Sequence, residues 1–157
     1  MILGNAIGID IDGVLADFTS GFAPILSTII GIVFPKNPNV VWHWPQHWGV
    51  SEAYVEQAWK EVMQDDTFWL DLNPLPDAIE NLERLSTLRY TGVDVYFLTY
   101  RMGVKAKWQT ERWLSAFGFP QPTVLLSTQQ KGYLVSGLNL DAVIDDKPEN
   151  VLDIKRM

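Results

Sequence analysis

Two aspartates spaced by one residue end the first apolar run of the chain. Residues 7–17 read IGIDIDGVLAD, so Asp10 and Asp12 are followed at once by Gly13. Side chains two residues apart in a strand point to the same side, so both carboxylates would face one site. Mg²⁺ prefers carboxylate oxygens and would offset the repulsion between two such charges. The alternative is a strand end with ordinary turn chemistry, in which Asp is common.

Four more residues suited to phosphate chemistry stand at or near the ends of later predicted strands. They are Thr99, Lys131, Asp145 and Asp146. Open α/β sheets bind ligands at the carboxyl ends of their strands. A hydroxyl and an ammonium there would hold phosphate oxygens, and carboxylates would supply a nucleophile, an acid/base and metal ligands for phosphoryl transfer. Taken alone, Thr99 is equally an ordinary strand-end threonine, and Lys131 is more readily explained as a solvated surface lysine.

The elements that would position these residues alternate between strands and helices. The expected strands cover 5–11, 93–99, 123–126 and 140–144; the expected helices cover 77–90, 104–117 and a short segment from about 129. In the helix over 77–90, Ile79, Leu82 and Leu85 are expected to face inward. The alternation predicts an α/β fold, a Rossmann-like three-layer sandwich with a central parallel sheet and right-handed crossovers. Only seven residues follow Asn150, so we expect no fifth strand.

A helical insert is predicted between the first two strands. It comprises a helix over 17–33 entered at Asp17 with a kink at Pro24, an aromatic segment over 40–48, and a helix after Ser51 with the apolar positions Val55, Ala58, Trp59 and Val62. We therefore divide the chain into a core of residues 1–16 and 71–157 and a small helical cap of residues 17–70.

The aromatic residues of this insert allow two interpretations. Trp42, Trp44, Trp48 and Trp69 could sandwich a nucleobase, or they could form the core of the insert, which we favour for most of them. His43 and His47 have metal-ligand spacing only within a helix, which Pro45 disfavours. We expect packing or substrate contacts from both histidines.

Composition limits the possible functions. At 157 residues and 47% hydrophobic content, the chain can form one domain with a sizeable core. The absence of cysteine excludes disulfides, zinc–thiolate sites and cysteine nucleophiles, and fits a cytoplasmic protein. A net charge of −7 argues against a polymeric nucleic-acid partner but allows a small phosphorylated one. Monomer and homodimer both remain open.

Neither a targeting signal nor a membrane partner is expected. The amino terminus lacks a basic region and leads directly into a strand. The uncharged run over 18–34 is at the short limit for a bilayer span and contains several polar residues. We therefore interpret it as a buried helix.

Four segments resemble, in order along the chain, the motifs of the haloacid dehalogenase superfamily of phosphohydrolases. They are DIDGV at 10–14, Leu98-Thr99, Lys131 and Ile144-Asp145-Asp146. The resemblance covers nearly the whole chain and extends towards the 5′(3′)-deoxyribonucleotidase branch. Similar segments are VLADF at 14–18, FWLDLNPLP at 68–76, Lys107-Trp108 and Trp113-Leu114.

This resemblance implies a Mg²⁺-dependent phosphomonoesterase acting on a small metabolite, with a nucleoside monophosphate as the leading substrate. Asp10 would be the nucleophile that forms an aspartyl-phosphate, and Asp12 the acid/base. The Asp10 carboxylate, the Asp12 carbonyl and the Asp145 carboxylate would bind Mg²⁺, with Asp146 nearby. Thr99 and Lys131 would hold the phosphate.

One departure concerns the residues after Thr99. Tyr100 and Arg101 replace the serine and proline usual in the deoxyribonucleotidase branch and are closer to the Thr-Gly-Arg of other superfamily phosphatases. Arg101 would add a phosphate-binding cation beside Tyr100, or it would pair with nearby acids. The departure suggests a phosphatase for nucleic-acid 3′ ends as an alternative function. A non-catalytic binding protein of the same fold is the third.

Overall fold

The computed structural model of the protein describes residues 5–34, 44–127 and 130–155. Its parallel sheet has the strand order β3-β2-β1-β4. The strands are β1 (Asn5–Ile9), β2 (Val93–Thr99), β3 (Thr123–Leu126) and β4 (Ala142–Ile144). Ile9 of β1 pairs with both Phe97 of β2 and Ile144 of β4. The carboxyl ends of these three strands therefore lie at one edge of the sheet. The predicted α/β fold is confirmed.

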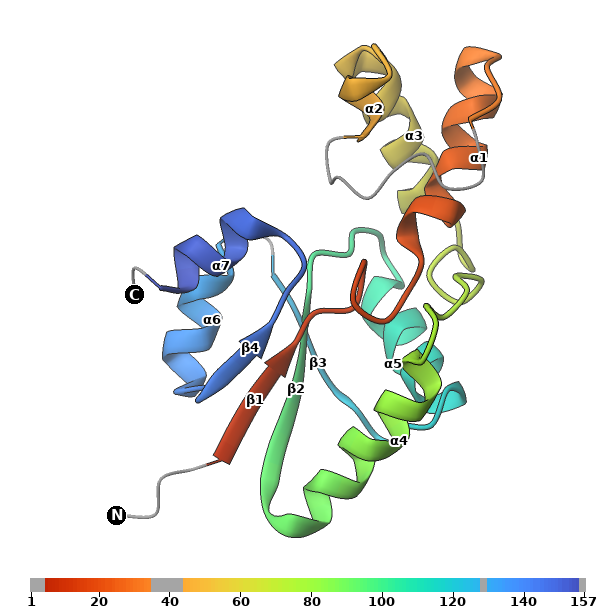
Figure 1. Cartoon of the computed structure of the whole chain (residues 1–157). Coiled ribbons are helices and arrows are strands. Elements are labelled where there is room, and N and C mark those ends of the chain that lie inside the picture. Colours follow the sequence, from red (N-terminus) through yellow and green to blue (C-terminus); the bar gives the residue numbers. More distant parts are fainter. Residues whose placement is uncertain (1–4, 35–43, 128–129, 156–157) are drawn as a thin grey trace.

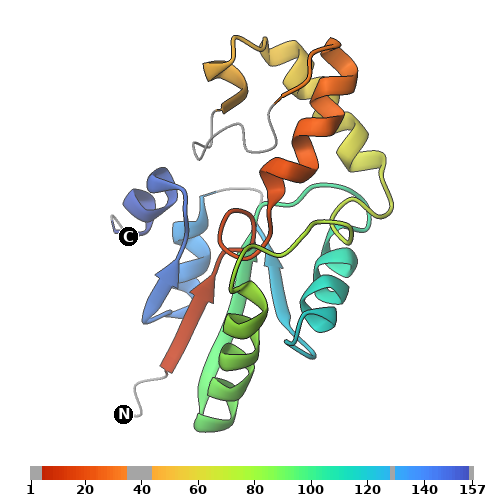
Figure 2. The same cartoon turned by 45° about the vertical axis from the view of Figure 1, so that its right-hand side comes forward.

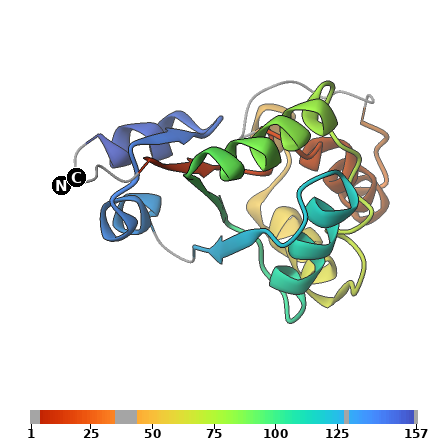
Figure 3. The ribbon, with the colours of Figure 1, turned by 90° about the horizontal axis from the view of Figure 1, so that it is seen from below.

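Helices cover both faces of this sheet. They are α4 (Ala78–Leu88), α5 (Ala106–Ala116), α6 (Lys131–Leu138) and α7 (Pro148–Ile154). Seen along the strands, α4 and α5 lie on one face, and α6 and α7 lie on the other (Figure 3). The predicted three-layer arrangement is therefore present, and the chain after β4 forms α7.

Three helices lie together beyond the carboxyl edge of the sheet (Figures 1 and 2). They are α1 (Phe18–Ile30), α2 (Trp44–His47) and α3 (Glu52–Gln64). The carboxylate of Asp17 caps α1 by accepting a hydrogen bond from the Ser20 N–H at 3.1 Å. Within the described ranges, no helix is long and apolar enough to cross a bilayer.

The two connections to these helices lie side by side. The Asp17 N–H donates to the Asn73 carbonyl at 2.9 Å, and the Leu75 N–H donates to the Leu15 carbonyl at 2.8 Å. Because both connections are hydrogen-bonded to each other, the helices above the sheet are tied to the loop that carries Asp12.

A single hydrophobic cluster runs from these helices into the sheet region. Trp44 and Trp69 are almost fully buried in it, which confirms core positions for them, whereas Trp48 is half exposed. Trp42 and His43 lie outside the described residues.

Two expectations were wrong. Residues 44–47 do form a short helix, because Pro45 stands in its first turn, where no N–H is needed.

The second correction concerns α4. Ile79 is 44% exposed, while Ala78 and Leu82 are buried and Leu85 is partly buried. Ala78 and Leu82 are one helical turn apart and define the buried face. Ile79 is rotated by about 100° from Ala78, which turns it towards solvent.

Candidate active site

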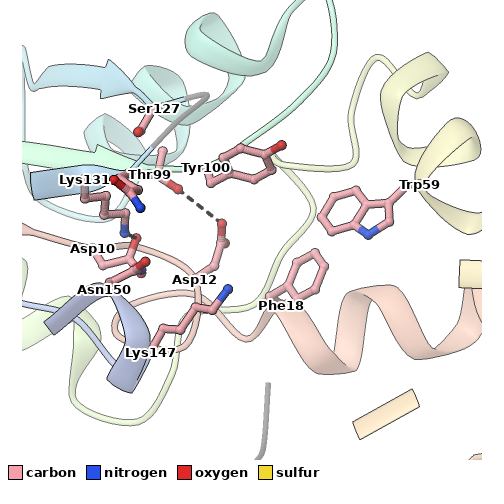
Figure 4. Close-up of a pocket in the computed structure, with 11 residues that line it drawn as sticks. Asp10, Asp12, Phe18, Trp59, Thr99, Tyr100, Ser127, Lys131, Lys147 and Asn150 are labelled. Atoms are coloured by element: carbon pink, nitrogen blue, oxygen red, sulfur yellow. Dashed lines mark hydrogen bonds and ion pairs between the residues drawn. The ribbon is translucent and has the colours of Figure 1, made fainter. Parts of the chain in front are cut away.

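Strand β1 ends at Ile9, two residues before the predicted strand end at Ile11. Asp10 and Asp12 therefore lie in the loop that follows β1. Both residues are buried, at 4% and 5% exposure. The Asp10 N–H still donates to the Ile144 carbonyl at 2.9 Å, which fixes the chain against β4. The two carboxylates have different neighbours: Asp10 faces Lys131, and Asp12 faces Thr99 (Figure 4).

Lys131, in the first turn of α6, bridges two of the carboxylates. Its Nζ lies 2.8 Å from Asp10 Oδ1 and 2.7 Å from Asp145 Oδ2. The Asn150 amide from α7 donates to both oxygens of Asp145, at 2.9 and 3.1 Å. The ends of β1 and β4 and the starts of α6 and α7 therefore converge on one charged cluster.

Asp10, Asp145 and Asp146 can form a metal site. Each offers an oxygen within 4.8 Å of those of the other two, and among the described residues no other acidic or histidine group of this kind is found. Gly13 has a φ of 83°, and a Cβ there would lie 1.9 Å from Asp146 Oδ2, so this glycine makes room for the carboxylate. Three hard carboxylate oxygens suit Mg²⁺. The Asp12 side chain lies outside this group.

Burial dominates the ionisation of Asp10. It raises the pKa of Asp10 from 3.8 to about 7; the ion pair with Lys131 opposes this, and the charges of Asp145 and Asp12 add to it. Burial alone would lower the pKa of Lys131, but the neighbouring carboxylates Asp10 and Asp145 outweigh it and raise that pKa above 10.5. The metal-free cluster thus holds an excess of negative charge that a divalent cation would balance.

A pH dependence of stability follows. Between pH 3.8 and about 7 the folded, metal-free protein binds a proton at Asp10 that the unfolded chain releases. Asp10 therefore lowers the free energy of unfolding as pH rises through this window. In chelator, Asp10→Asn should raise the melting temperature relative to the unmodified chain at about pH 7.5, and raise it clearly less near pH 5, where only the first part of this window has been crossed. Equal differences at both pH values would contradict this.

Thr99, the last residue of β2, and the next residue, Tyr100, line the cavity, whereas Arg101 points into the protein interior. Thr99 is fully buried, and its hydroxyl donates to Asp12 Oδ2 at 3.3 Å. Tyr100 is half exposed and borders the cavity, whereas Arg101 is buried and does not. Arg101 forms an ion pair with Asp12, with Nη2 2.7 Å from Oδ1. Of the two interpretations of Arg101, the geometry favours pairing with an acid.

These groups open into a cavity of about 320 Å³. Besides the predicted residues, its lining includes Phe18, Trp59, Ser127, Gln130, Lys147 and Asn150. The rings of Phe18 and Trp59 stack with centroids 5.4 Å apart and form one wall of the cavity (Figure 4). We call this pair the aromatic wall.

These additional lining residues are not among the predicted site residues. Ser127 directly follows β3 and its N–H donates to the Thr99 carbonyl, so the strand-end argument used for Thr99 could have found it. Lys147 and Asn150 carry no such signal. Trp59 was expected only as part of an apolar helix face.

Comparison with known proteins places the chain in a family. The family model described as 5′ nucleotidase, deoxy (Pyrimidine), cytosolic type C protein matches residues 4–156. The chain belongs to this family. Membership confirms the predicted resemblance to the deoxyribonucleotidase branch.

Two curated relatives show how far the similarity extends. The chain is 25% identical over 147 residues to the mitochondrial 5′(3′)-deoxyribonucleotidase of Homo sapiens, covering 90% of this chain and 61% of that protein. It is 26% identical over 148 residues to the Mus musculus protein of the same name, covering 90% and 64%. The chain thus spans just over three fifths of the length of these relatives. Because both are named as mitochondrial, the cytoplasmic location of this chain stays a prediction.

The fold also has a solved counterpart. A crystal structure of a hydrolase from Streptococcus pneumoniae superimposes with a TM-score of 0.59 at 13% sequence identity, covering 99% of this chain and 89% of that one. At this identity the similarity concerns the fold alone.

Proposed function

We propose that the protein is a Mg²⁺-dependent phosphomonoesterase that hydrolyses nucleoside monophosphates through an aspartyl-phosphate on Asp10. The observation that carries the proposal is the pairing of buried Asp10 with Lys131 at 2.8 Å, beside the acidic group of Asp145 and Asp146. Family membership supports the same activity. In this account residues 17–70 form a cap over the site.

The residues of the chain would divide the reaction into two steps. An Asp10 carboxylate oxygen attacks phosphorus, and the bond to the leaving alcohol breaks as the alcohol oxygen takes a proton from the Asp12 carboxyl group, which enters this step protonated. A water molecule then loses a proton to Asp12 and attacks the aspartyl-phosphate, which releases phosphate and restores both aspartates. Asp10 Oδ1 is held by the Ile11 N–H at 2.8 Å and by Lys131, so the nucleophile is oriented before substrate arrives.

The remaining charges would serve the phosphoryl group. Bound at Asp10, Asp145 and Asp146, Mg²⁺ would stabilise negative charge on the phosphoryl oxygens. Lys131 lies within reach of the same oxygens, because its ammonium is already beside Asp10. Thr99 and Tyr100 would complete this end of the cavity.

The cavity favours a small substrate with a planar group. Its volume of about 320 Å³ is within the size range of small-molecule sites. The aromatic wall of Phe18 and Trp59 faces the same space as the carboxylates, so a base could stack there while its phosphate reaches Asp10. The two relatives named as 5′(3′)-deoxyribonucleotidases support nucleotides as substrates.

Shortening the aromatic wall should weaken nucleotide binding selectively. We expect Trp59→Leu to raise KM for nucleoside monophosphates about 10-fold, since one base–aromatic stack is worth about 1–3 kcal/mol. KM for ribose 5-phosphate, which has no base, should stay nearly unchanged. Trp108→Leu is the matched control, because Trp108 is half exposed and does not line the cavity. An equal rise in KM for both substrates would contradict base stacking.

A substrate panel tests the function itself. Phosphate release is measured with Mg²⁺ from nucleoside monophosphates, p-nitrophenyl phosphate and a 3′-phosphorylated oligonucleotide. We expect turnover of the mononucleotides. Release from the oligonucleotide alone would support the 3′-end phosphatase instead, although Arg101, which suggested that alternative, does not reach the cavity. A stable beryllofluoride adduct without any hydrolysis would support the non-catalytic alternative.

A further inference from the structure

Arg101 is bound to Asp12 through two parallel hydrogen bonds. Its Nη2 donates to Asp12 Oδ1 at 2.7 Å, and its Nε donates to Oδ2 at 3.1 Å. Both side chains are buried, at 0% and 8% side-chain exposure. A planar guanidinium that grips both carboxylate oxygens fixes the plane of the carboxylate as well as its position.

The guanidinium is itself held on its other sides. Its Nη1 donates to the Thr110 hydroxyl at 3.1 Å, and that hydroxyl donates to the Ala106 carbonyl on α5 at 2.7 Å. The Arg101 guanidinium carbon also lies 4.8 Å from the centre of the Trp69 ring. Arg101 is therefore anchored to α5 and to the segment that returns from the helices above the sheet.

Trp69 links this anchor to the aromatic wall. Its indole N–H donates to the Met102 carbonyl at 3.0 Å, and its ring lies parallel to that of Phe18, with centroids 6.1 Å apart. Contacts of buried groups therefore run from Asp12 through Arg101 and Trp69 to Phe18, which lines the cavity. The carboxylate and the wall that would bind the substrate share one support.

We propose that Arg101 is a positioning residue that fixes the Asp12 carboxylate for proton transfer to the leaving group. This inference rests on the proposed function. It differs from a role in binding phosphate, because Arg101 does not border the cavity and already pairs with Asp12. A purely structural ion pair would affect the turnover of every substrate alike, whereas the positioning role affects only the step in which a poor leaving group needs a proton.

Leaving-group dependence tests this assignment. The p-nitrophenolate ion leaves without help from an acid, whereas the alkoxide of a nucleoside needs a proton, and kcat/KM reports only the steps up to departure. General acid catalysis is worth about 10²–10⁴-fold, so Arg101→Lys should lower kcat/KM for a nucleoside monophosphate at least about 10-fold. For p-nitrophenyl phosphate the change should stay within about 3-fold. Thr110→Val should give a smaller loss with the same selectivity.

The control is Arg89→Lys, which alters another partly buried arginine that lies over an aromatic ring, 4.2 Å from the centroid of Phe119. It should leave the ratio between the two substrates unchanged. An equal loss of kcat/KM for both substrates in Arg101→Lys would overturn the proposal and favour a phosphate-binding or structural role.

A readout independent of activity separates this proposal from the function on which it rests. If Arg101 grips Asp12, the melting-temperature changes of Arg101→Lys and Asp12→Asn should not add in the double variant. Additive changes would overturn the positioning role even if the protein is a phosphatase. Coupled changes in a protein that releases no phosphate from any ester would overturn the proposed function and leave a structural ion pair.

Discussion

Replacing Asp10 with Asn should reduce phosphate release from nucleoside monophosphates by at least about 10³-fold at saturating Mg²⁺. An amide at this position is a poor nucleophile, and it also removes one of the carboxylates of the acidic group. The carboxylate faces Lys131 in the cavity, and the other aspartate of the lining, Asp12, is already paired with Arg101. Initial rates over a range of substrate concentrations measure the loss in kcat and in kcat/KM.

Asp94→Asn is the matched control for this variant. Asp94 is exposed near the amino end of β2, far from the carboxyl edge where the site lies. Its variant should retain nearly full activity. Residual turnover by Asp10→Asn within about 10-fold of the unmodified protein would show that the reaction does not need this nucleophile.

Removing the metal, or one carboxylate that would bind it, is the second change with a large expected effect. Chelation should abolish phosphate release, and added Mg²⁺ should restore it. Asp145→Asn should raise the Mg²⁺ concentration for half-maximal activity at least about 100-fold, because a charged ligand is lost from a group of three. Titration of activity with Mg²⁺ measures this concentration, and the rise in melting temperature with Mg²⁺ gives a second measure.

Asp141, which directly precedes β4, provides the control for Asp145, which directly follows it. The Asp141 carboxylate accepts a hydrogen bond from the Ala6 N–H at 2.7 Å, far from the cavity. Asp141→Asn should therefore alter stability but leave the Mg²⁺ requirement unchanged. An unchanged requirement in Asp145→Asn, or full activity in chelator, would contradict the metal assignment.

The sheet could be predicted closely because its strands are short apolar runs with clear limits. The bounds of β2 and β3 agree with the prediction, and Gly92, with a φ of 87°, ends the preceding helical segment as expected. The convergence of Asp10, Lys131 and Asp145 also followed from the parallel topology, which brings the carboxyl ends of strands together.

The composition of the cavity wall could not be predicted in the same way. Helical periodicity indicates that Trp59 points inward, but it does not show that Phe18, 41 residues earlier in the sequence, stacks on it at the border of the cavity. The role of Arg101 could not be predicted either, because a cation near acidic groups can bind a phosphate ligand or form an ion pair with one of the acids. Only the distances to Asp12 and Thr110 separate the two.

The central claim is that the phosphoryl group is first transferred to Asp10 and forms a covalent bond with it. The variant Asp12→Asn provides the most direct test. With p-nitrophenyl phosphate this variant should form the aspartyl-phosphate without an acid but hydrolyse it slowly without a base. Rapid quenching and mass spectrometry should then find one phosphoryl group on the peptide that contains Asp10, together with a burst of nitrophenolate equal to the enzyme present. Steady release without a burst, or a phosphoryl group on any other residue, would contradict the account.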